Sequence, residues 1–146
     1  MTMGYDAFPQ PEHNDPDSVQ AAIEALREAR DESSADEAYD AFLWAVGNNH
    51  AGTFYPVVLA VLPEIEKILV NGEYWGQRAA IEALIDLGGS FAPEKGHETY
   101  LGGSVLATLR TFIQSLRRQV APLAIGEDPR AKSAAELLEL IDDLSV

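Results

Sequence analysis

The expected fold is decided by residues 54–87, which read FYPVVLAVLPEIEKILVNGEYWGQRAAIEALIDL. Apolar residues recur there every three or four positions, as they do on one face of an amphipathic α-helix. This spacing predicts two helices, over residues 54–70 and 73–87, with inward faces formed by Val58, Leu62, Ile65, Leu69, Ile81, Leu84 and Ile85. Pro56 fits a first helical turn, whereas Pro63 removes an interior hydrogen bond and predicts a kink or a split.

The same helical spacing continues on both sides of this central pair. Upstream it predicts a helix over residues 16–30, with Asp15 as its N-cap, and a second helix that starts at a capping box over residues 34–37. Downstream it predicts a loop over residues 90–97, a helix from about residue 100 or 104 to residue 120, and a last helix that starts near Asp128-Pro129. No segment longer than a few residues alternates with the period of two that is typical of strands.

Six helices joined by short links pair naturally into three antiparallel hairpins, over residues 16–47, 54–87 and 100–144. The hairpins start roughly 40 residues apart, which is the period of HEAT-type helical repeats. The sequence therefore predicts an all-α fold, either a HEAT-like α–α superhelix or a plain six-helix bundle. We expect one helical domain over residues 16–146, preceded by a flexible acidic tail over residues 1–15.

The composition is strongly acidic, with 10 Lys and Arg against 24 Asp and Glu, a formal charge of −14. Residues 1–50 alone carry 11 acidic and 2 basic side chains. Such a charge opposes unaided binding to nucleic acid or anionic membranes, because phosphate groups are bound mainly by Lys and Arg, and it favours a basic partner. Residues 57–62 form the longest apolar run, which is too short to span a bilayer. The N-terminal residues lack the pattern of a secretory signal, so we expect a cytoplasmic protein.

The usual patterns of catalysis and metal binding are missing from the sequence. There is no cysteine, and His13, His50 and His97 have none of the spacings that place two imidazoles on one metal. Residues 102–104 lack the lysine of a phosphate-binding loop, and no Gly-x-Ser-x-Gly turn occurs. We therefore expect no metal, no cofactor and no enzymatic activity, and a small helical enzyme that uses carboxylates is the weaker alternative.

Acidic and aromatic residues fall on the outward faces of the second helix of each hairpin. Placing each helix at 100° per residue gives the outward set Glu37, Asp40, Trp44, Trp75, Glu82, Asp86, Glu139 and Asp143. In a HEAT-like stack the second helices line one surface, so these residues would form an acidic groove with aromatic anchors suited to a basic protein. The alternative is an ordinary solvated surface, with both tryptophans packed against neighbouring helices. Arg78 is expected to pair with an acid of the preceding hairpin.

A family resemblance is carried by Phe54-Tyr55-Pro56, by Pro63 and by Gln77-Arg78 before a Leu-rich helix. Residues 36–95 resemble the central part of small bacterial HEAT-repeat-like proteins. Many proteins of that kind are immunity partners of polymorphic toxins, and others are scaffolds. The resemblance implies a non-enzymatic binding module, an immunity protein that neutralises a cognate toxin through its acidic surface, or alternatively a scaffold or adaptor in a larger assembly.

Overall fold

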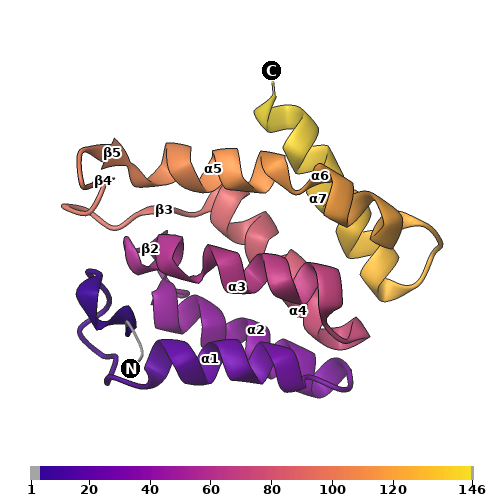
Figure 1. The fold of residues 1–146 in the computed structure, drawn as a ribbon, viewed down its shortest axis with the longest axis horizontal. Helices are drawn as coiled ribbons and strands as arrows, with labels where there is room; N and C mark the ends of the chain where they lie inside the picture. Colours follow the sequence, from indigo (N-terminus) through magenta and orange to yellow (C-terminus); the bar gives the residue numbers. More distant parts are fainter. Residues whose placement is uncertain (1–3, 146) are drawn as a thin grey trace.

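The helices of this protein form two layers, as the computed structural model shows for residues 4–145 (Figure 1). One layer holds α1 (Ser18–Glu28), α3 (Val57–Asn71) and α5 (Val105–Ser115). The other layer holds α2 (Glu32–Val46), α4 (Tyr74–Ile85) and α7 (Pro129–Leu144). Within each layer the helices contact one another in chain order, so α4 lies between α2 and α7. The predicted helical character is confirmed.

The count of helices differs from the prediction. The described residues form seven α-helices, because the segment expected to be one helix up to residue 120 breaks at Leu116 into α5 and the short α6 (Arg117–Val120). A 3₁₀ turn, η3 (Ala121–Ala124), follows and contains Pro122. The start of α7 matches the prediction, since the Asp128 side chain caps the helix by accepting a hydrogen bond from the Ala131 amide.

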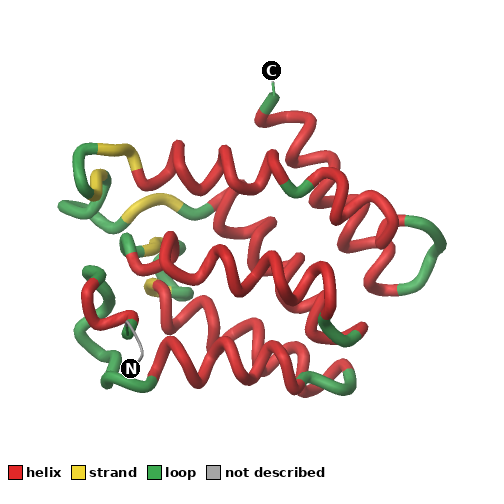
Figure 2. Tube along the Cα trace, in the orientation of Figure 1, coloured by secondary structure: helices red, strands yellow, loops and turns green. Residues whose placement is uncertain are grey.

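Five strands of two residues each also depart from the all-α prediction. A small sheet pairs β1 (Gly47–Asn48) with β2 (Thr53–Phe54), and β2 with β3 (Ala92–Pro93). A separate pair joins β4 (Thr99–Tyr100) to β5 (Gly103–Ser104). Figure 2 shows these strands gathered at one end of the helical layers. Two residues are too few to produce an alternating pattern, so these strands could not be predicted from the sequence.

The N-cap of α2 is a different residue from the one in the predicted capping box. The cap is Asp31, whose side chain accepts a hydrogen bond of 2.7 Å from the Ser34 amide, while the Ser34 hydroxyl accepts one from the Asp31 amide. The bond from the Ser34 amide is the main cause that holds the pKa of Asp31 below its usual value, because it stabilises the charged carboxylate. The helix thus begins three residues earlier than a box based on Ser34 and Glu37 requires. Aspartate is as effective an N-cap as serine, so the pattern allowed both.

Pro63 does not split α3, which runs unbroken from Val57 to Asn71 with Pro63 on its exposed side. The next helix, α4, is the central one and contacts α1, α2, α3 and α7. It passes close to α1 at Gly76, where an added Cβ would overlap the carbonyl oxygen of Leu26. A π-helical turn, η2 (Asp86–Ser90), extends α4 at its end.

The N-terminal segment, expected to be a flexible tail, instead makes specific contacts with the helical body. After a 3₁₀ turn, η1 (Tyr5–Ala7), the Pro9 carbonyl accepts a hydrogen bond from the Val57 amide at 3.1 Å. The Asn14 side chain donates to the Ala45 carbonyl at 2.7 Å. The Phe8 ring lies 5.2 Å from that of Tyr100. Within the described residues of this segment, residues 4–15, the chain is therefore part of the fold; residues 1–3 lie outside them.

Candidate functional site

Two of the predicted acids, Glu82 and Asp86, lie on the middle helix of the α2–α4–α7 layer and on the turn that extends it. They are one helical turn apart, at the end of α4 and the start of η2, and both are partly buried. The Tyr39 hydroxyl of α2 donates a hydrogen bond to Asp86, and the Ser133 hydroxyl of α7 donates one to Glu82 at 2.8 Å. Because both donors are neutral, they fix the two carboxylates without cancelling their charge.

The negative field of this cluster acts on Tyr39. Burial raises the pKa of the Tyr39 phenol above its usual value, and the hydrogen bond to Asp86 raises it further. The charges of Asp86, Glu82 and Asp40 add to this rise. Three of the predicted acids are therefore close enough to one phenol to act on it together. We call Tyr39, Asp40, Glu82 and Asp86 the carboxylate cluster.

Tyr39→Phe should lower the free energy of unfolding at pH 7 by about 1 kcal/mol, through loss of one hydrogen bond to a partly exposed carboxylate. The raised folded-state pKa of Tyr39 stabilises the fold below the unfolded value near 10, and this contribution is lost as the pH rises toward the higher folded value. The difference between wild type and variant should therefore shrink above pH 10. Denaturant unfolding from pH 7 to 11, with absorbance at 295 nm, measures it; a constant difference would contradict the assignment.

The other predicted site residues are not all gathered at this cluster. Glu37 is exposed on α2 outside the cluster, and Glu139 and Asp143 are exposed on α7. Trp75 is partly buried at the opposite end of α4 from Asp86 and lies 5.5 Å from the Arg78 guanidinium.

The Trp44 side chain lies beside α1 and the N-terminal segment and not in the predicted groove. Its ring stands 5.7 Å from that of His13, and it lines a hollow together with residues of α1 and the N-terminal segment. The structure therefore brings three of the six predicted acids, Asp40, Glu82 and Asp86, to one tyrosine, but separates the two tryptophans that were expected to anchor the same groove.

The predicted pairing of Arg78 with the preceding hairpin is confirmed. Its guanidinium lies 3.6 Å from the Glu32 carboxylate of α2. Nε and Nη1 of Arg78 are buried and make no hydrogen bond among the described residues. Arg78 thus supplies a cation at the Trp75 end of the face, while the end with Glu82 and Asp86 remains acidic.

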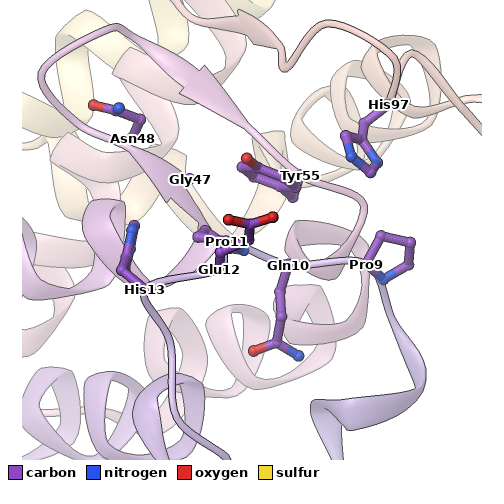
Figure 3. A pocket seen from close by; sticks show the side chains of 9 residues that line it. All are labelled: Pro9, Gln10, Pro11, Glu12, His13, Gly47, Asn48, Tyr55 and His97. Atoms are coloured by element: carbon purple, nitrogen blue, oxygen red, sulfur yellow. The ribbon is translucent and has the colours of Figure 1, made fainter.

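A cavity of about 450 Å³ lies beside the N-terminal segment, and the sequence did not reveal it. Its polar and aromatic lining comes from Glu12, His13, Asn48, Tyr55 and His97, and residues 9–11 with Gly47 complete the wall. Figure 3 shows the Glu12 carboxylate near the middle of this group, with the Tyr55 ring behind it and His97 beside Tyr55. These residues come from distant parts of the chain, and residues 1–15 were assigned to a tail, so no local pattern could join them.

The described residues hold no group of three His, Cys, Asp or Glu side chains placed to bind a metal ion. In the same residues no helix has both the length and the apolar character needed to cross a membrane. Comparison with known proteins found no matching family model, no matching curated protein and no matching solved structure.

Proposed function

We propose that this protein is a non-enzymatic binding module whose α2–α4–α7 face binds a basic protein. The observation that carries the proposal is the fixed pair Glu82 and Asp86, held by hydroxyl groups from both neighbouring helices. Carboxylates that are already oriented lose little conformational freedom when a cation approaches. They also attract a basic partner before contact, which raises the association rate.

The flanking helices extend the negative charge on both sides of this pair. Asp36, Glu37 and Asp40 are exposed on α2, as are Glu136, Glu139 and Asp143 on α7. Within residues 4–145 the acids in ion pairs are Glu32, Glu64 and Asp142. The other acids of this face therefore remain available to a partner's Lys and Arg side chains.

The helical arrangement is compatible with the HEAT-like superhelix that the sequence resembles. First and second helices of the three hairpins form separate layers, and neighbouring hairpins contact each other in both layers. In such stacks the second helices present an extended binding surface. Together with the resemblance of residues 36–95, this supports an immunity protein that neutralises a basic toxin as the specific form of the function.

The test pairs this chain with the basic protein encoded by the gene next to its own. Glu82→Gln/Asp86→Asn removes two charges, while each amide oxygen can still accept the hydroxyl hydrogen bond. We expect at least about tenfold weaker binding by calorimetry, and weaker binding of the wild type as salt rises. The matched control is Glu24→Gln/Glu28→Gln, an acid pair with the same spacing on α1, and it should change affinity less than about twofold.

A cell-growth assay with the same partner distinguishes an immunity protein from an adaptor. An immunity protein must protect cells from the partner, whereas an adaptor would bind it without protection. Absence of both complex and protection would contradict the proposed function. A complex that is insensitive to the Glu82 and Asp86 substitutions would show that another surface binds.

A further inference from the structure

The cavity beside the N-terminal segment has walls that are fixed by the backbone. The Tyr55 amide donates to the Val46 carbonyl at 2.8 Å, and the His97 amide donates to the Glu94 carbonyl at 2.8 Å. On the opposite side, Pro9 accepts the hydrogen bond from Val57, and His13 Nε2 lies 2.7 Å from the Trp44 carbonyl oxygen. The side chains that line the cavity are therefore attached to constrained backbone from separate segments.

One side of the cavity is aromatic. The rings of Tyr55 and His97 have their centroids 4.8 Å apart and are inclined at 47° (Figure 3). Aromatic ring faces attract cations through their quadrupole, and the flat guanidinium group of arginine also stacks on them.

A carboxylate stands in front of this aromatic pair. Glu12 lines the cavity and, among the described residues, makes neither an ion pair nor a hydrogen bond through its side chain. No Lys or Arg in the described part of the chain lines the cavity. Burial and the negative charges of Glu94 and Glu12 raise the pKa of the Tyr55 phenol, so the field at this wall is negative. An anionic ligand would be repelled here, whereas an organic cation would be attracted.

We propose that this cavity binds a guanidinium cation, which stacks against Tyr55 and His97 and donates paired hydrogen bonds to Glu12. A guanidinium presents two parallel N–H groups that match a carboxylate, and it is more weakly hydrated than an ammonium ion. It therefore loses less free energy of hydration when it enters a cavity with an aromatic wall. The shared chemistry belongs both to free arginine and to an arginine residue of another chain.

The test uses N-acetyl-L-arginine amide as the probe, titrated into the full chain and followed by NMR chemical shifts. We expect a dissociation constant of about 1 mM, corresponding to about 4 kcal/mol of binding free energy, as befits one exposed carboxylate and two rings. N-acetyl-L-citrulline amide has nearly the same shape without the charge and should bind at least about tenfold more weakly. N-acetyl-L-lysine amide should also bind more weakly, because ammonium cannot form the paired bonds.

Two variants locate the binding. Glu12→Gln should weaken binding of the arginine probe about tenfold, and His97→Ala should weaken it a few-fold through loss of one ring. Glu28→Gln is the matched control, since it removes another exposed carboxylate, on α1 and outside both proposed sites, and it should leave the affinity unchanged. NMR spectra dispersed as in the wild type would show that each variant is folded.

The measured affinities show which source of guanidinium the cavity prefers, and they can overturn the proposal. Comparing free L-arginine with the capped amide identifies the source: tighter binding of the free amino acid indicates a metabolite, and equal or weaker binding indicates an arginine residue of a chain. Absence of binding at about 20 mM probe, equal binding of the citrulline probe, or full binding by Glu12→Gln would each overturn the proposal. None of these measurements needs the protein partner, so they stand independently of the α2–α4–α7 face.

Discussion

Gly76→Val is expected to lower the free energy of unfolding by about 3 kcal/mol. A Cβ at residue 76 would overlap the carbonyl oxygen of Leu26, an atom of the α1 backbone that no side-chain rotation can move. Relief of the overlap requires α1 and α4 to separate, and overpacking of this kind typically costs 1–3 kcal/mol, occasionally more. Since α4 packs against helices of both layers, its displacement would disturb the packing of both.

Thermal unfolding measures this effect, with an expected fall in Tm of roughly 6–12 °C for a chain of this size. Gly89→Ala is the control, because an added Cβ there meets only the Leu140 side chain at ordinary contact distances of 3.6 Å and 3.9 Å. It should change stability by less than about 0.5 kcal/mol. A Gly76→Val protein as stable as the control would show that α1 and α4 do not approach each other closely.

The sequence was informative where the signal is local. Helical periodicity correctly placed a helical hairpin over residues 54–87, because each apolar stripe belongs to a single element. Asp128-Pro129 correctly marked the start of α7, since an N-cap and a proline in the first turn are adjacent features. Helical geometry also placed Glu82 and Asp86 on one face, one turn apart, although the structure buries both of them partly.

Features that depend on contacts between distant segments could not be predicted in this way. Wheel geometry placed Trp44 outward, but its ring direction depends on His13, 31 residues away in the chain. The hydroxyls of Tyr39 and Ser133 that hold Asp86 and Glu82 come from other helices. The cavity at Glu12 and His97 combines a segment without periodicity with a loop, and neither has a pattern that specifies its partner.

Gly47→Ala is expected to have the second large effect, because Gly47 both pairs in the β1–β2 ladder and lines the cavity. It pairs with Phe54 between β1 and β2, and an added Cβ would overlap the Thr53 carbonyl oxygen and lie 2.7 Å from the Phe54 Cα. Both are backbone atoms, so β1 and β2 must separate, and we expect a loss of about 3 kcal/mol.

The same substitution should abolish binding of N-acetyl-L-arginine amide even in the folded fraction. Gly47 lines the cavity together with Asn48 and Tyr55, and separation of the strands would displace both of these side chains. Gly103→Ala is the matched control in β5, where the nearest atom to an added Cβ is the Tyr100 carbonyl oxygen at 3.8 Å. It should retain stability and probe binding. Because stability and binding are measured separately, a Gly47→Ala protein that is weakened in folding yet binds the probe normally would place the guanidinium site outside this cavity.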